Sequence, residues 1–220
     1  MNNLMRILLS FFIACFISLP LMAEESAPVS AKPYTLGSED KAALERVEKY
    51  LTDIHSLSAE FTQAAPSGDI SSGMFYLKRP GRLRMEYASP TPVLMVARDN
   101  DIVYYDKELD QVTHIPLGST LVGFLARSEV RFDDSVIITG VERSNGILRV
   151  TLVQSKHPKD GSLTLEFADQ PLIIRNMIVS DSSGQVTTVS LSNAKFDVPL
   201  AEDLFVFTDP HQGSSRGIRK

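Results

Sequence analysis

The stretch that decides the fold reads GMFYLKRPGRLRMEYASP and covers residues 73–90. It divides at Pro80-Gly81 into two short arms, and in each arm apolar residues alternate with polar or charged ones. A period of two predicts neighbouring antiparallel strands with one apolar face and one face toward water. The apolar face carries five side chains, namely Phe75, Leu77, Leu83, Met85 and Tyr87.

The charged face of this hairpin carries Lys78, Arg82, Arg84 and Glu86. We interpret Arg82 and Arg84 as exposed residues that aid solubility, because their parity points away from the apolar face. Arg79 differs, since it shares the parity of the apolar residues and falls at the end of their face. An arginine in that position is a candidate functional residue, and a solvated turn residue is the alternative.

The length and charge of the chain limit the classes of function open to it. With 220 residues the chain is long enough for one sizeable core or two small ones. A net charge of −5 argues against a nucleic acid as its main partner, because neutralising phosphates needs clustered Lys and Arg. Only the tail at residues 214–220 is locally basic, and we interpret it as a solvated chain end.

Residues 1–23 have the pattern of a secretory signal peptide. Arg6 precedes an apolar run at residues 7–19, which is shorter than the roughly 20 apolar residues of a comfortable membrane span. We expect cleavage after Ala23, and cleavage after Ala31 is a weaker alternative. The mature protein is therefore expected to be exported and soluble, with a flexible leader at residues 24–37 that is rich in Ser, Ala and Pro.

Cys15 is the only cysteine of the chain and lies within the apolar run of the signal peptide. It is a poor lipid-attachment site, because Phe12-Ile13-Ala14 lacks the usual leucine and the apolar run continues past the cysteine. The mature chain then contains no cysteine, so we expect neither a disulfide nor a thiolate metal site.

A single domain is expected over residues 38–213. A helix with one apolar stripe begins at Ser38 and extends to about residue 56. About ten short strand-like segments follow, joined by turn sequences such as Asn145-Gly146, and the last segment is Leu204–Phe207. The exception is residues 121–127, which favour a short apolar helix.

So many successive strands with short connections predict one large antiparallel sheet that must curl or close. A closed barrel would leave the long helix no apolar surface to pack on. We therefore expect a mainly β fold with α: an unclosed (half) antiparallel β-barrel, with both helices forming a lid over a hydrophobic cavity on its concave side.

The sequence offers no assembled catalytic site. Its four histidines are scattered without metal-ligand spacing, and neither a nucleophile elbow nor a glycine-rich phosphate loop is present. His114 follows Asp106 and Asp110 closely enough to suggest a base, but we interpret it as a surface residue on a strand. We accordingly expect a protein that is not an enzyme and has no metal and no cofactor.

Several motifs together resemble the outer-membrane lipoprotein carrier protein family (LolA-like). They are the Phe61-Thr62-Gln63 tripeptide, the K-R-P-G-R-x-R-x-x-Y pattern that ends at Tyr87, and the segments 105–113, 121–127 and 205–210. The resemblance covers residues 44–213. It implies a periplasmic carrier that shields the acyl chains of lipoproteins in an apolar cavity and transfers them from the inner membrane to an outer-membrane receptor.

The same resemblance implies partners and roles for particular residues. The partners are triacylated lipoproteins, an inner-membrane ABC-type release complex and an outer-membrane lipoprotein receptor, and we expect the carrier to be a monomer. The family's functional arginine falls on Arg79, which would hydrogen-bond the lid and hold the empty form shut. The acyl-chain cavity is expected to be lined by Phe61, Phe75, Leu77, Leu83, Met85, Tyr87, Leu121, Phe124 and Leu125.

The chain departs from the family pattern at two places. Leu83 and Met85 are aliphatic where better-studied relatives carry aromatic residues, and Ser119-Thr120 lacks the proline that often starts the second helix. The alternative function is a periplasmic binding protein or sensor for another lipid on the same fold. A hydrolase has no assembled site here, and the receptor variant of the fold would need a better lipid-attachment cysteine than Cys15.

Overall fold

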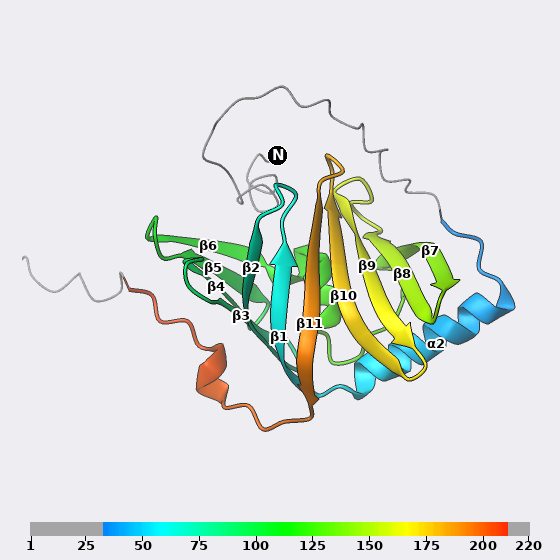
Figure 1. Ribbon diagram of the computed structural model, residues 1–220, viewed down its shortest axis with the longest axis horizontal. Helices are drawn as coiled ribbons and strands as arrows, with labels where there is room; N and C mark the ends of the chain where they lie inside the picture. Colours follow the sequence, from blue (N-terminus) through cyan, green and yellow to red (C-terminus); the bar gives the residue numbers. More distant parts are fainter. Residues whose placement is uncertain (1–32, 211–220) are drawn as a thin grey trace, which may run out of the picture. The chain divides into compact units, whose positions relative to one another are not determined.

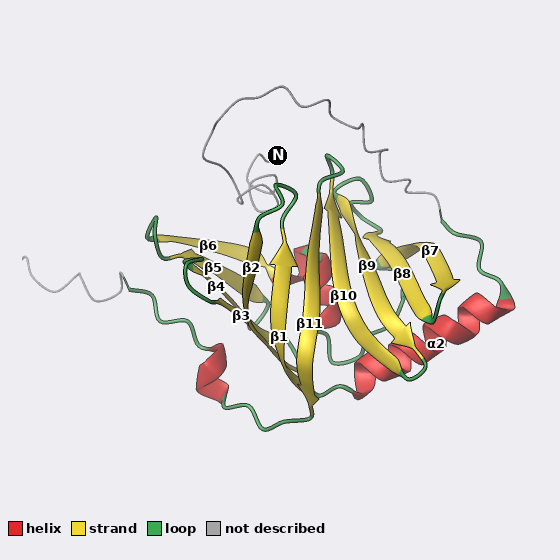
Figure 2. Ribbon diagram, in the orientation of Figure 1, coloured by secondary structure: helices red, strands yellow, loops and turns green. Residues whose placement is uncertain are grey.

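The computed structural model describes residues 33–210 (Figure 1). The expected signal peptide at 1–23, the leader up to residue 32, the last three residues of the expected domain and the basic tail at 214–220 lie outside the described residues. Strands make up most of the described chain, and the helices are few (Figure 2).

The described chain begins with helix α2 and continues through eleven strands. The helical segments are α2 (Ser38–Asp53), α3 (Leu121–Leu125) and the 3₁₀ turns η1 (Leu117–Ser119) and η2 (Glu202–Phe205). The strands are β1 (Ser56–Ala64), β2 (Ile70–Lys78), β3 (Arg82–Tyr87), β4 (Val93–Arg98), β5 (Asp101–Asp106), β6 (Gln111–Pro116), β7 (Val136–Ser144), β8 (Ile147–Gln154), β9 (Gly161–Asp169), β10 (Leu172–Asp181) and β11 (Val186–Phe196).

The eleven strands form one sheet in the order β6-β5-β4-β3-β2-β1-β11-β10-β9-β8-β7. Most neighbours in the sheet are also consecutive in the chain, as expected for strands joined by short turns. β6 and β7 stand at the two ends of this order, so the sheet is not closed. The expectation of a mainly β fold with an unclosed antiparallel sheet and few helices is thus confirmed.

The chain divides into two compact units, which we describe separately. The described residues of the first unit are 33–40, 63–70 and 132–190, and those of the second are 41–62, 71–131 and 191–210. All of the predicted site residues belong to the second unit. That residues 38–213 form a single domain stays a prediction.

The first unit has a core made by β8, β9 and β10. Alternate residues of β8 and β9, such as Val150, Leu152, Leu163 and Leu165, are at most 1% exposed. The turn between β7 and β8 is built by Asn145-Gly146, both with positive φ, as the sequence predicts.

The N-terminal turn of α2 is anchored to β7 through Asp40. Its Oδ2 accepts a hydrogen bond from the Gly37 N–H at 3.0 Å, and its Oδ1 lies 3.1 Å from Nη1 of Arg143. Arg143 also donates to the carbonyl oxygen of Glu39 at 2.7 Å. The Gly37 N–H and, to a smaller extent, Arg143 hold the pKa of Asp40 below its ordinary value, because both favour the carboxylate.

In the second unit, β2 and β3 form the predicted hairpin. The register pairs Phe75 with Met85, Leu77 with Leu83 and, next to the turn, Lys78 with Arg82. All five side chains assigned to the apolar face are between 2% and 8% exposed. The alternation in the sequence therefore identified the correct face.

The end of α2 and the C-terminal segment differ from the sequence prediction. α2 ends at Asp53 rather than near residue 56, because the following carbonyls bond to the β2–β3 turn. Leu204–Phe207 is not a strand, and the prediction was wrong. Its residues form the end of η2 and an extended stretch, in which the Leu204 carbonyl accepts a hydrogen bond from the Arg84 side chain.

The backbone of Gly73 approaches its neighbours too closely for a side chain. A Cβ at this position would lie 2.8 Å from Cε1 of Phe61 and closer still to the carbonyl oxygen of Glu86. We predict that Gly73→Ala lowers the free energy of unfolding by about 1–3 kcal/mol, the usual cost of overpacking. Gly118→Ala is the matched control, because a Cβ there meets nothing within 4 Å. Equal denaturation midpoints for the two variants would contradict the close approach.

Candidate functional site

The turn between β2 and β3 places the Arg79 side chain against residues that follow both helices. Its Nε donates to the carbonyl oxygen of Ile54 at 2.8 Å, and its Nη1 donates to that of Arg127 at 2.5 Å. Ile54 directly follows α2, and Arg127 comes shortly after α3. One planar guanidinium therefore connects the ends of two helices that are far apart in the sequence.

The backbone of the same turn makes a parallel pair of connections. The Arg79 N–H donates to the carbonyl oxygen of His55 at 2.9 Å, and the Gly81 N–H donates to that of Ala126 at 2.7 Å. The turn therefore bonds to two consecutive carbonyls after α2 and to two consecutive carbonyls after α3. In each pair, one carbonyl accepts from the Arg79 side chain and the other from a backbone N–H of the turn. We call residues 79–81 together with these carbonyls the latch.

The charge of Arg79 is partly removed from water. Burial lowers the pKa of its guanidinium to about 10, because desolvation disfavours the charged form. The group still carries its proton at neutral pH. Its carbonyl partners compensate for part of the lost hydration, and the carbonyl of Ile54 stands at the partially negative C-terminal end of α2.

Thr52 makes a second connection between α2 and the chain beyond α3. Its Oγ1 accepts from the Val130 N–H at 3.0 Å and lies 3.3 Å from the carbonyl oxygen of the same residue, to which it donates. Val130 itself is fully buried. The two helices therefore have their C-terminal ends fixed by both the latch and Thr52.

The short helix α3 directly follows Thr120 and not a proline. The Oγ1 of Thr120 accepts a hydrogen bond from the Gly123 N–H at 3.0 Å, so Thr120 is the N-cap of α3. The same hydroxyl donates to the carbonyl oxygen of Leu117 at 2.9 Å. A side-chain cap thus starts the helix in place of a proline.

The residues predicted to line an acyl-chain cavity are nearly all buried. Phe61 and Tyr87 meet edge to face with ring centroids 4.9 Å apart, and both are at most 6% exposed. Phe124 and Leu125 on α3 are 3% and 7% exposed, whereas Leu121 is only half-buried. With the five side chains of the β2–β3 face, eight of the nine predicted residues are buried. Their role in binding stays a prediction.

The opposite face of the hairpin, which we call the outer face, is covered rather than exposed. Lys78 Nζ and Arg82 Nε lie 2.6 Å and 2.9 Å from the two carboxylate oxygens of Glu202 in η2. Arg84 Nη1 donates to the carbonyl oxygen of Leu204 at 3.2 Å. The side chains of Arg82 and Arg84 are only 27% and 15% exposed, so their interpretation as solvated residues was wrong.

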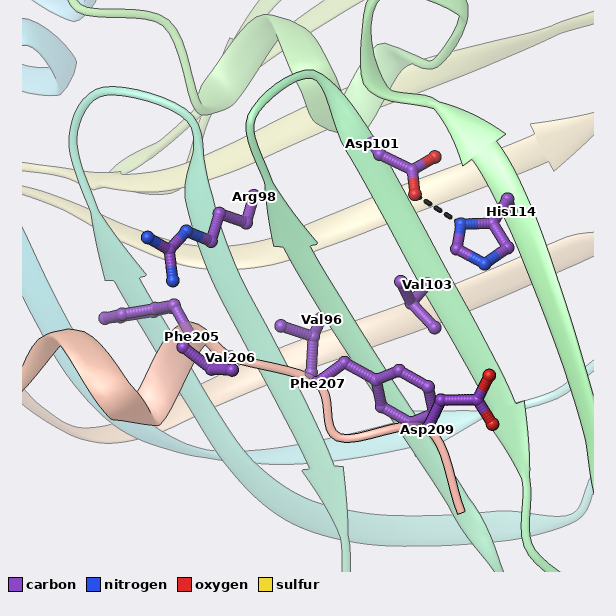
Figure 3. Close-up of a pocket in the computed structure, with 9 residues that line it drawn as sticks. All are labelled: Val96, Arg98, Asp101, Val103, His114, Phe205, Val206, Phe207 and Asp209. Atoms are coloured by element: carbon purple, nitrogen blue, oxygen red, sulfur yellow. Dashed lines mark hydrogen bonds and ion pairs between the residues drawn. The ribbon is translucent and has the colours of Figure 1, made fainter. Parts of the chain in front are cut away.

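A pocket of about 250 Å³ lies on the outer face where the C-terminal segment crosses β4 and β5 (Figure 3). Its residues come from β4, β5, β6 and from the chain after η2. They are Val96, Arg98, Asp101, Val103, His114, Phe205, Val206, Phe207 and Asp209. The sequence interpretation missed this pocket because it treated residues 204–207 as a strand.

A signal for the pocket is nevertheless present in the sequence. Residues 93–97 read VLMVA, a continuous apolar run without alternation, which indicates that both faces of the strand are covered. The register confirms this, since Val96 lies opposite Arg84 on one side and opposite Val103 on the other. Val96 therefore belongs to the outer face, where it is 1% exposed.

His114 contacts the carboxylate of Asp101, and not Asp106 or Asp110, which the sequence analysis considered. Its Nδ1 lies 2.5 Å from Oδ2 of Asp101 across the β5–β6 ladder (Figure 3). The imidazole is 63% exposed, so this contact lies at the surface. Within residues 33–210, no three His, Cys, Asp or Glu side chains gather where they could hold a metal ion. No helix among these residues is long and apolar enough to span a membrane.

Comparison with known proteins identifies the family. The family model described as "Outer membrane lipoprotein carrier protein LolA" matches residues 52–208, so the chain belongs to the LolA family. This range includes the latch, the hairpin and η2.

Curated relatives agree with this assignment. An outer-membrane lipoprotein carrier protein of Methylococcus capsulatus is 29% identical over 173 residues, which cover 75% of this chain and 83% of the relative. A protein of the same name from Legionella pneumophila is 30% identical over 180 residues, which cover 77% and 87% of the two chains.

One solved structure shows a similar fold at low sequence identity, and a second match is weaker. A DUF1329 family protein from Desulfovibrio piger matches with a TM-score of 0.50 and 13% identity, covering 76% of this chain and 96% of that one. A LolA superfamily protein from Nitrosomonas europaea matches with a TM-score of 0.44 and 12% identity, covering 74% and 97%.

Phe205 anchors the C-terminal segment to the outer face, because its ring is fully buried and borders the pocket. We predict that Phe205→Ala lowers the free energy of unfolding by about 3–5 kcal/mol, the usual cost of removing a buried aromatic ring. Val206→Ala is the neighbouring control, and it should cost little because Val206 is 44% exposed. Urea titrations of both variants measure the difference, and similar midpoints would show that the segment is not anchored by Phe205.

Proposed function

We propose that the protein is a carrier that shields the acyl chains of lipoproteins between two membranes. The observation that carries this proposal is the latch, in which a partly buried arginine at the end of an apolar face bonds to the residues after both helices. Such an arrangement holds apolar side chains away from water in the absence of cargo. It also lets the helices move away when cargo replaces those contacts.

The magnitudes favour a loaded carrier that can still release its cargo. Burying a methylene stabilises by about 0.8 kcal/mol, so one long acyl chain gains on the order of 10 kcal/mol. Each hydrogen bond from a charged donor contributes about 1.5–3 kcal/mol to the closed form. Cargo therefore opens the latch, and the latch reduces the net affinity by an amount that assists release.

The proposal extends to location and partners. The expected signal peptide at residues 1–23, with cleavage after Ala23, supports a periplasmic carrier. We propose that it accepts triacylated lipoproteins from an inner-membrane ABC-type release complex and delivers them to an outer-membrane receptor as a monomer. Carriage or sensing of another lipid is the alternative, because apolar side chains do not specify a headgroup. Mass spectrometry of the lipids and lipoproteins that co-purify from the periplasm distinguishes the two.

Leu83 tests whether the apolar face of the hairpin receives acyl chains. Its side chain is 2% exposed, so Leu83→Glu places a carboxylate without a partner among apolar groups. We predict loss of binding of a fluorescent palmitoyl-chain probe, measured by titration. Thermal unfolding must be recorded alongside, because the buried carboxylate also destabilises the fold. Leu109→Glu, at a position 53% exposed, is the control that should bind normally. A folded Leu83→Glu protein that binds the probe like the wild type would contradict the face assignment.

Arg79 tests the latch itself. Arg79→Leu removes the two side-chain hydrogen bonds, so the open form becomes more populated and binding of the palmitoyl-chain probe should tighten by about tenfold or more. Transfer of a loaded lipoprotein to outer-membrane vesicles should become correspondingly slow. Arg79→Lys, which keeps the charge but lacks the planar fork, should give an intermediate rate. Transfer at the wild-type rate by a folded Arg79→Leu protein would exclude the latch.

A further inference from the structure

The two residues beside the latch turn carry like charges on the outer face. Lys78 and Arg82 are the last cross-strand pair of the hairpin before residues 79–81. Cations directly opposite each other in an antiparallel pair repel and destabilise it. The strand ends that carry Arg79 are thus the part of the hairpin that most needs an additional interaction.

Glu202 supplies that interaction from η2. Lys78 Nζ lies 2.6 Å from Oε1 of Glu202, and Arg82 Nε lies 2.9 Å from its Oε2. One carboxylate therefore contacts both strands at their last pair. The hydrogen bond from Lys78, with the charges of Arg82 and Lys78, holds the pKa of Glu202 below its ordinary value, against a smaller effect of desolvation.

The position of Glu202 is itself fixed by neighbouring contacts. η2, the short orange helix of Figure 1, lies against β3 and β4. Lys78 Nζ also donates to the carbonyl oxygen of Leu200 at 2.8 Å, and Arg84 to that of Leu204 at 3.2 Å. With Phe205 fully buried between these contacts and the pocket, the carboxylate is held over the strand ends.

We propose that Glu202 is a positioning residue for Arg79. On the outer face it neutralises the Lys78–Arg82 pair, and it thereby holds the turn whose arginine closes the lid on the opposite face. This inference rests on the proposed carrier function for its biological consequence. The contacts it requires, those of Glu202 with Lys78 and Arg82 at the end of the hairpin, can be tested without any cargo.

The Glu202 side chain is 55% exposed, so each ion pair by itself contributes little to global stability. The local consequence is larger, because removing the carboxylate leaves two cations facing each other at the turn. Glu202→Gln should therefore leave the thermal midpoint nearly unchanged and act on the hairpin end. This separation distinguishes positioning from a general structural role.

Hydrogen exchange tests the positioning directly. The amides of Arg79 and Gly81 donate to the carbonyls of His55 and Ala126, so their exchange rates report opening of the latch. In the cargo-free full chain, Glu202→Gln should accelerate exchange of both amides by roughly 2- to 5-fold. Glu108→Gln, an exposed carboxylate on the β5–β6 turn, should leave them unchanged. Unchanged rates in Glu202→Gln would overturn the proposal.

A second substitution separates charge neutralisation from mere contact. In the double variant Glu202→Gln with Arg82→Gln, only one cation remains at the last pair, so the repulsion is gone. Exchange of the Arg79 amide should return toward the wild-type rate. Exchange that stays fast, or becomes faster than in Glu202→Gln alone, would show that charge is not the cause and would overturn the proposal.

A cargo-transfer assay tests whether Glu202, on the outer face, acts through Arg79, on the opposite face. Glu202→Gln should tighten binding of the palmitoyl-chain probe and slow transfer by roughly 2- to 5-fold in the wild-type background, and should add nothing in Arg79→Leu. Equal effects in both backgrounds would mean that Glu202 does not act through Arg79. If Arg79→Leu itself transfers normally, the latch proposal fails, while faster exchange in Glu202→Gln would still support the contact of Glu202 with the hairpin end.

Discussion

A guanidinium held partly away from water needs hydrogen-bond acceptors, and this requirement organises the contacts around the β2–β3 turn. Arg79 finds its acceptors in the carbonyls of Ile54 and Arg127, which follow two different helices. The donors are planar and fixed, so the two helix ends can satisfy them only from particular positions. Hydrogen bonds from one side chain therefore hold the residues that follow both helices.

The sheet provides the frame on which this requirement is met. In β2 and β3 the period of two separates an apolar face from a charged one, and both faces are occupied. Apolar residues of the hairpin are buried on one side, and the C-terminal segment covers the basic residues on the other. Because both of its faces are covered, the hairpin leaves no broad apolar surface in water.

The sequence predicted features that depend on local patterns and failed where a distant segment decided the outcome. Alternation identified the five buried residues of the hairpin, and Asn145-Gly146 identified a turn. Arg82 and Arg84 were misinterpreted because their parity predicts a face but not what covers it. Their partners, Glu202 and Leu204, are about 120 residues away in the sequence.

The candidate site, too, was predicted from the sequence only in part. Parity and the family motif singled out Arg79 and implied hydrogen bonds to the lid, but they did not identify the carbonyls of Ile54 and Arg127 as the acceptors. The pocket beside β4 was missed although the run at residues 93–97 indicated burial on two faces. A strand with two buried faces requires a covering segment, and nothing in the local pattern says which segment that is.

Two adjacent residues at the end of β2 act on opposite faces of the sheet, so the hairpin is sensitive to the length of this strand as well as to its composition. Lys78 bonds to Glu202 on one side of the sheet, and the next residue, Arg79, bonds to the helix ends on the other. Deleting a single residue from β2 would exchange the two faces, sending the lysine inward and the arginine outward. The number of residues between Gly73 and Pro80 therefore matters as much as their identity.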